Sequence, residues 1–183
     1  MEDIDADITL SKLDAAKRQL ETAVNLWFEE RDAVSIHTLA AAAHRVAHDV
    51  ATHRGGGAFL LDHDRLAGWG YDPKTFKKAL RQAETFFKHA ENDPHDTYTF
   101  STSQTESILA SAIECFHGLV SERSPVLALF MGWFHFRHSD TLSEAARDRF
   151  AKLLPRINQL TRSQFRAELG NLDFVRLVYP NVA

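Results

Sequence analysis

The stretch AVSIHTLAAAAHRVAHDVATHR, residues 33–54, constrains the fold most, because small and apolar residues recur in it at helical spacing. At about 100° per residue, one arc of this predicted helix carries Leu39, Ala43, Val46 and Val50, with Ile36, Ala40 and Ala47 at its edge. Alanine side chains let a neighbouring helix approach closely. We therefore expect this helix to lie at the centre of a helical bundle.

Three histidines lie just beyond the alanine edge of this arc. His37, His44 and His48 fall within about 40° of one another on the helical wheel. We expect them at the boundary between core and water, and histidines four residues apart on one helix can share a divalent metal. His37, His44 and His48 are therefore a candidate metal site. No carboxylate of the same helix is in register with them, since Asp49 points elsewhere, so we favour ordinary hydrogen-bonded histidines over a metal.

Caps and breakers divide the rest of the chain into further predicted helices. Apolar spacing predicts helices over residues 9–30, 33–54, 73–91, 103–120, 125–138, 141–154 and 161–170. Four pairs resemble capping boxes, namely Ser11 with Asp14, Ser103 with Glu106, Thr141 with Glu144, and Thr161 with Gln164. Asp32 and Asp72 are expected N-caps, three glycines from Gly55 should end the second helix, and Pro155 should break the sixth.

These elements predict one all-α domain, a single helical bundle of about six or seven helices spanning residues 1–183. Residues 1–8 should be frayed, residues 58–71 irregular or a short helical turn over Trp69 and Tyr71, and residues 171–183 a docking tail. The segment 125–138 is apolar on almost every side, which is typical of a buried helix or an oligomer interface. Because this helix and the tail offer more apolar surface than a small bundle covers, we predict a homodimer.

Charge and cysteine content bound the compartment and the partners. The net charge of −4 disfavours nucleic acid and anionic membranes as partners, although local basic patches can still form. The one cysteine, Cys115, excludes an intramolecular disulfide and favours a reducing compartment. We see no apolar run long enough to span a bilayer. We therefore expect a cytoplasmic protein with no membrane segment. Its partner can be a protein or a small molecule.

The segment Arg31 to His37 matches the loose arginine–polar–spacer–histidine pattern of the HEPN ribonucleases. The resemblance implies that Arg31 would stabilise phosphate charge and that His37 would act as an acid or base. In that family the motif usually opens a later helix, whereas here it lies between the first two. The alternative is structural, with Asp32 as an N-cap and Arg31 at the C-terminal end of the first helix dipole.

Two further patterns, the pair Glu114 and His117 and the single Cys115, do not indicate a catalytic site. Glu114 and His117 match one half of a carboxylate-bridged di-iron bundle, but such a bundle needs a second copy, and Glu114 is expected to face water. Cys115 lies beside the apolar arc of its helix, where a buried, inert thiol is the common case.

A wider resemblance covers roughly the first half of the chain. The segments KLDAAKRQLETAVNLWF, DAVSIHTLAAAAHRV and TFKKALRQAETFFKHAENDP resemble an uncharacterised group of bacterial all-helical proteins, with FFKHAENDP the most distinctive portion. The resemblance implies a bacterial source and a helical fold, and it carries no catalytic residues. Any relation to the HEPN bundles would be remote.

The sequence holds no complete catalytic constellation, so we expect a non-enzymatic binding or protein-interaction module that needs no cofactor. The alternative is a metal-dependent or HEPN-like ribonuclease-type enzyme that uses the face of His37, His44 and His48, with a divalent metal as its cofactor.

Overall fold

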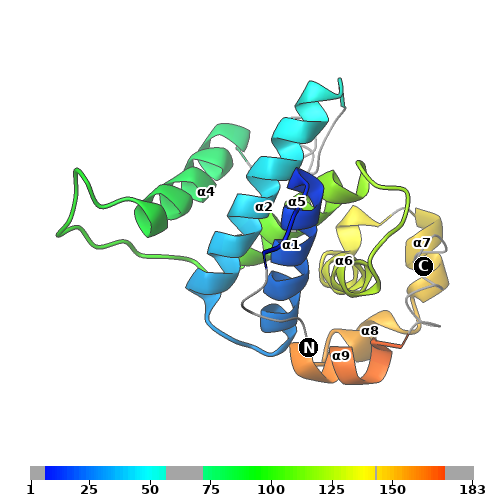
Figure 1. Cartoon of the computed structure of the whole chain (residues 1–183). Coiled ribbons are helices and arrows are strands. Elements are labelled where there is room, and N and C mark those ends of the chain that lie inside the picture. The colour runs from blue at the N-terminus through cyan, green and yellow to red at the C-terminus, as the bar shows by residue number, and fades with distance from the viewer. Residues whose placement is uncertain (1–6, 57–71, 143, 172–183) are drawn as a thin grey trace.

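The computed structural model describes residues 7–56, 72–142 and 144–171, and in these ranges the chain is helical with no β-strand (Figure 1). The helices are α1 (Lys12–Phe28), α2 (Ala33–His53), α4 (Pro73–Lys88), α5 (Ser103–His117), α6 (Pro125–Arg137), the 3-10 turn η1 (Ser139–Thr141), α7 (Glu144–Phe150), α8 (Leu154–Ile157) and α9 (Arg162–Leu169). The all-α prediction is confirmed. Expectations for residues 1–6, for Trp69 and Tyr71 in the 57–71 segment and for the tail 172–183 lie outside the described residues.

Helix α2 lies between its neighbours, as its alanine content predicted. It packs along both α1 and α5, and it also contacts α4 (Figure 1). Helix α6 packs against α1 and α5, with α9 against α1 and α6. Figure 1 shows α4 on the opposite side of the α1–α2–α5 layer from α6 and α7. The molecule therefore has two flanks, one made by α4 and one made by α6 to α9.

The alanines of α2 explain this close packing. Ala40, Ala43 and Ala47 are fully buried, and Ala41 and Ala51 nearly so. The predicted arc was partly wrong, because Leu39, Val46 and Val50 are only half-buried. Since α2 is covered by helices on more than one side, its buried face is wider than one arc and extends toward the histidines.

Local capping signals position several helix ends. The Asp14 N–H donates to Ser11 Oγ at 3.1 Å, and the Asp14 carboxylate accepts from Ser11 N, which confirms that capping box. Asp32 accepts from Ser35 N at 2.7 Å, as predicted for an N-cap. The box at the start of α9 and the Asp72 cap of α4 are confirmed in the same way. Helix α2 ends at His53, and Gly55, just beyond the C-cap Arg54, takes the left-handed φ of 71°.

Two predicted capping boxes are wrong. Thr102, not a boxed serine, is the N-cap of α5 and makes no side-chain cap bond, while the Ser103 hydroxyl lies 2.8 Å from that of Ser101. The Thr141 hydroxyl donates to the His138 carbonyl at 2.6 Å and closes the η1 turn. In place of one helix over 141–154, the chain therefore forms η1 and then α7. Pro155 lies at the start of the separate short helix α8, which confirms the break.

Helix α6 is buried within its own chain. Nine of its thirteen residues are buried, and Phe130 and Phe136 are among the largest fully buried side chains. Because these apolar side chains are covered within the chain, α6 no longer requires a second copy to cover it. The homodimer stays an untested prediction. Among the helices that the structure describes, none is long and apolar enough to cross a membrane.

Candidate functional site

His37 lies inside the protein and not at its boundary, which corrects the expectation from the helical wheel. Its side chain is fully buried, and its ring makes edge contacts with Phe87 of α4 and with Phe100, at centroid distances of 5.8 and 5.0 Å. Nδ1 lies 3.4 Å from Thr105 Oγ1 on α5, and Nε2 has no hydrogen-bond partner in the described part of the chain. Burial lowers the pKa of His37 from 6.5 to about 4.

The next two histidines become progressively more accessible along α2. His44 is half-buried, and its Nε2 lies 3.1 Å from Ser111 Oγ on α5. Burial, followed by the neighbouring His48, lowers the pKa of His44 to about 4. The side chain of His48 is 47% exposed and lies 3.8 Å from the carboxylate of Asp49. The stripe therefore runs from core to solvent, with its first two members paired to hydroxyls of α5.

This arrangement offers little support for the candidate metal site. The rings of His44 and His48 have centroids 6.0 Å apart, but His37 is enclosed by phenylalanines. No cluster of three or more histidine, cysteine or acidic side chains suited to a metal ion occurs within residues 7–56, 72–142 and 144–171. The site of His37, His44 and His48 therefore stays a prediction that the described geometry does not favour.

Arg31 and His37 lie in different environments, one exposed and the other buried. Arg31 is exposed in the turn between α1 and α2, and its Nε lies 3.4 Å from the Glu29 carboxylate. His37 is sealed from solvent, whereas a general acid or base has to reach a bound substrate. The structural alternative, with Asp32 capping α2, is confirmed by its bond to Ser35 N. A HEPN-like reaction at these residues has no support from this geometry.

The structure confirms the expectation for Cys115 but not the one for Glu114. Cys115 is a fully buried thiol, as predicted. Glu114 is half-buried, so the expectation that it faces water was wrong. His117 is half-buried, and burial lowers its pKa to about 4.

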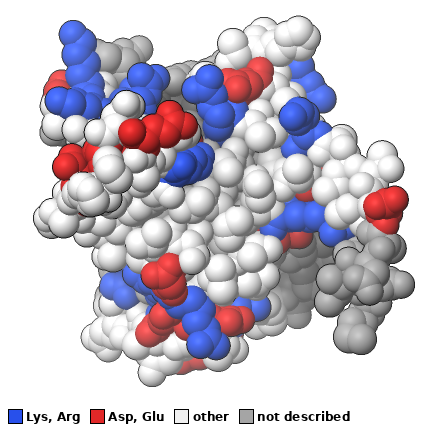
Figure 2. Space-filling view, turned by 60° about the vertical axis from the view of Figure 1, so that its left-hand side comes forward, with Lys and Arg blue, Asp and Glu red and all other residues white. Residues whose placement is uncertain are grey.

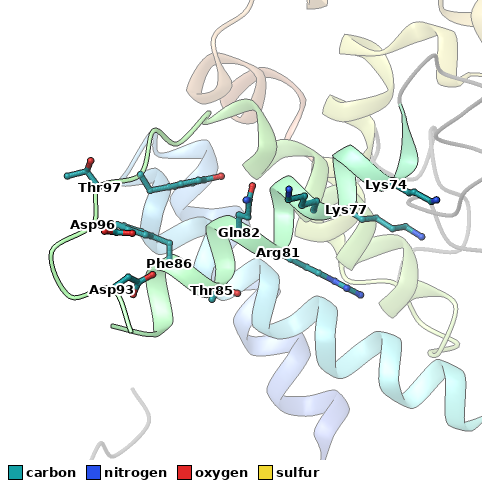
Figure 3. A pocket seen from close by; sticks show the side chains of 11 residues that line it. Lys74, Lys77, Arg81, Gln82, Thr85, Phe86, Asp93, Asp96 and Thr97 are labelled. Carbon is teal, nitrogen blue, oxygen red and sulfur yellow. The ribbon is translucent and has the colours of Figure 1, made fainter. Parts of the chain in front are cut away.

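A groove along α4 is a candidate site that the sequence motifs did not indicate. Its volume is about 650 Å³, and one wall carries Lys74, Lys77, Lys78 and Arg81. These positions follow the i, i+3, i+4, i+7 spacing that brings side chains onto one helix face. Figure 3 shows Lys74, Lys77 and Arg81 extending from α4. The spacing was readable in the sequence, but only the folded loop supplies the second wall.

The second wall comes from the loop after α4 and has a different chemistry. It carries Asp93, Asp96 and Tyr98, and the Tyr98 ring lies 5.4 Å from that of Phe86 on α4. In Figure 3, Phe86, Asp93 and Asp96 lie at the end of α4 away from Lys74. The groove is therefore basic toward the start of α4 and acidic and aromatic toward its end.

The four cations of the groove form no ion pair with the described residues. None of Lys74, Lys77, Lys78 and Arg81 has an ion-pair partner in the part of the chain that the structure describes, whereas Lys88 pairs with Glu84 at 2.7 Å. The first turn of α4 has no acidic residue. Of the four cations only Lys74 lies in this first turn, where a cation opposes the helix dipole at a typical cost of about 0.3–1 kcal/mol. In the view turned toward α4, Lys and Arg side chains lie over the upper part of the surface among acidic ones, and a second mixed group lies below them (Figure 2).

Comparisons with known proteins add no assignment: no protein-family model, no curated protein and no solved structure matches the chain. The resemblance to bacterial helical proteins therefore stays a prediction.

Proposed function

We propose that this protein is a non-enzymatic interaction module whose α4 groove binds an acidic segment of a partner protein. The observation that carries the proposal is the row of four cations, Lys74, Lys77, Lys78 and Arg81, along one wall of the groove, none of which forms an ion pair with a described residue. Within the described residues these exposed cations form no ion pair that would stabilise the fold. An acidic partner would gain from them, because complementary charge accelerates encounter and sets orientation.

The shape of the groove supports a peptide-like occupant. From Lys74 to Thr85 the wall extends over about 16 Å, three turns of helix, which matches a short helical or extended segment. Phe86 and Tyr98 provide an aromatic surface at one end for an apolar side chain. We infer a partner segment that carries acidic residues toward the start of α4 and an apolar anchor toward its end.

Two features favour a protein partner over a nucleic acid. Asp93 and Asp96 line the same groove and would repel a continuous phosphate backbone. The chain as a whole carries a net charge of −4. An acidic protein segment has separated charges and can avoid the two aspartates.

We also infer a cytoplasmic location. The single cysteine of the sequence, Cys115, is buried, and a chain without an internal disulfide is typical of a reducing compartment. A homodimer is compatible with the proposed function but is not required by it.

The proposal is tested by fluorescence anisotropy with a labelled peptide of about twelve residues in which Glu and Leu dominate, long enough to fill the groove as an extended or helical segment. The variant Lys74→Glu/Lys78→Glu/Arg81→Glu should bind it at least about tenfold more weakly than the wild type. The matched control, Arg147→Glu/Arg149→Glu/Lys152→Glu, reverses three exposed cations around α7 and should bind like the wild type.

Binding that is absent in the wild type, or equal in both variants, would refute the proposal. A single-stranded oligonucleotide that binds the wild type more tightly than the peptide would overturn the choice of a protein partner. Circular dichroism of each variant checks that the helical fold is retained.

A further inference from the structure

A second cleft lies on the other flank of the molecule, between the end of α1 and the start of α9. Its volume is about 670 Å³, and the side chains that line it include Glu30, Glu106, Trp133, Arg137, His138 and Arg162. These residues come from four separate parts of the chain, so only folding brings them together. None of them takes part in the α4 groove.

Arg162 is the residue of this cleft whose guanidinium stacks on a buried ring but forms no hydrogen bond with the described residues. Its guanidinium carbon lies 3.3 Å from the centre of the fully buried Trp27 ring, and the side chain is half-buried. Burial lowers the pKa of Arg162, which means that its charge has lost part of its hydration. Within the described residues it has neither a hydrogen-bond acceptor nor a carboxylate at ion-pair distance. Its five N–H donors are thus available to an anion.

The neighbouring Arg137, in the same cleft, differs from Arg162 because its guanidinium donates hydrogen bonds within the protein. It lies over Trp133 at 4.4 Å and donates to the carbonyls of Asn158 and Leu160 at 3.0 and 2.8 Å. Arg137 therefore has a structural role in holding the segment between α8 and α9. Arg162 begins α9 and has no such bonds, so the comparison singles it out as the ligand-binding cation.

His138 supplies a second cationic group. Its Nε2 lies 3.1 Å from the Glu106 carboxylate, and its ring lies 4.6 Å from that of Phe134. The hydrogen bond with Glu106 raises the pKa of His138, which favours the imidazolium. Glu106, whose side chain is 20% exposed, is thereby occupied by a partner within the protein.

Glu30 limits the charge of any ligand that the cleft accepts. It has a φ of 56°, and its backbone occupies the position after α1 that glycine usually takes. The Glu30 N–H donates to the Trp27 carbonyl, and the carboxylate accepts the Ser163 hydroxyl at 3.4 Å. With Glu30 and Glu106 both in the cleft, a highly charged anion would meet repulsion, whereas a single anionic group would meet an excess of cations.

We propose that this cleft binds a small ligand through one carboxylate or phosphate group, which Arg162, stacked on the buried Trp27, and His138 hold. The guanidinium provides the planar fork that suits either oxyanion. The site is separate from the α4 groove, so it would persist if the groove had no partner.

The test is an NMR titration of the full chain with sodium phosphate and, separately, with sodium acetate, at ionic strength held constant with sodium chloride. We expect saturable chemical-shift changes at Arg162 Nε–H and at the backbone amides of Thr161 and His138. Saturation with phosphate alone identifies a phosphate ligand, and saturation with acetate identifies a carboxylate. Shifts that grow linearly with both salts, or that chloride alone reproduces, would overturn the proposal.

Variants separate a built site from a general effect of charge. Arg162→Gln should weaken binding of the preferred anion at least about tenfold, and Arg162→Lys should retain part of it, because lysine keeps the charge but loses the fork. Arg147→Gln, which removes an exposed cation of α7, should bind like the wild type. If Arg162→Gln fails to fold, His138→Gln replaces it with the same expectation. Wild-type affinity in a folded Arg162→Gln or His138→Gln protein would refute the site.

Discussion

The burial of His37 predicts a specific loss of stability in mild acid. Burial lowers its pKa from 6.5 to about 4, so the unfolded chain takes up a proton well before the folded chain does as the pH falls. This histidine's contribution to stability is therefore intact above pH 6.5 and is lost progressively down to about pH 4. With these two pKa values, proton linkage gives a loss of about 2 kcal/mol in the free energy of unfolding between pH 7 and pH 5.

His37→Leu isolates this effect because leucine fills a similar space and cannot titrate. At pH 7 the variant loses the long contact with Thr105 but also removes the Nε2 atom that lacks a partner, so we expect a change within about 1 kcal/mol. At pH 5 the variant should have lost about 2 kcal/mol less than the wild type. Urea denaturation followed by circular dichroism at both pH values measures the difference. His95→Leu, which removes an exposed histidine, serves as the control.

An equal loss between pH 7 and pH 5 in the wild type and in His37→Leu would refute the reasoning. It would mean that His37 is hydrated or paired in solution in a way that its enclosure by Phe87 and Phe100 does not allow.

Three further changes test the packing and the helix ends by urea denaturation. Ala43→Leu places a large side chain at a fully buried position of α2 and should cost about 1–3 kcal/mol; an unchanged midpoint would show that α2 is not closely packed there. Glu30→Gly relieves the left-handed backbone after α1 and should stabilise the chain by about 1 kcal/mol, so a loss of stability would count against that conformation. Thr161→Ala removes a capping box and should cost about 1 kcal/mol, and a neutral result would contradict the Thr161 bond to Gln164 N.

Features that depend on a few neighbouring residues could be predicted from the sequence. The caps at Ser11, Asp32, Asp72 and Thr161 are examples, because each side chain bonds a backbone amide three residues ahead. The alanines of α2 likewise indicated a central helix, since side-chain size sets how closely helices pack.

Features that depend on distant parts of the chain could not be predicted in the same way. Glu106 has a good local position for a capping box, yet its carboxylate binds His138. His37 looked like a boundary residue on the wheel of α2 because the wheel contains no information on Phe87 and Phe100. Local spacing therefore identifies helices, but it does not show which of their polar groups find tertiary partners.

The two candidate sites differ in the same way, because only the α4 groove has a local signal in the sequence. The basic spacing from Lys74 to Arg81 is visible in the sequence, but the wall that makes it a groove comes from the loop carrying Asp93 and Tyr98. The cleft around Arg162 has no local signature, because its side chains come from α1, α5, α6 and α9.

The most direct test of the proposed function is a charge exchange across the α4 groove. The wild type should bind the Glu-rich peptide and reject the same peptide with each Glu replaced by Lys, while Lys74→Glu/Lys78→Glu/Arg81→Glu should show the opposite preference in the same anisotropy assay. Such a reversal requires direct contact between the peptide and these three side chains. If the reversed groove shows the same preference as the wild type, α4 is not the binding surface.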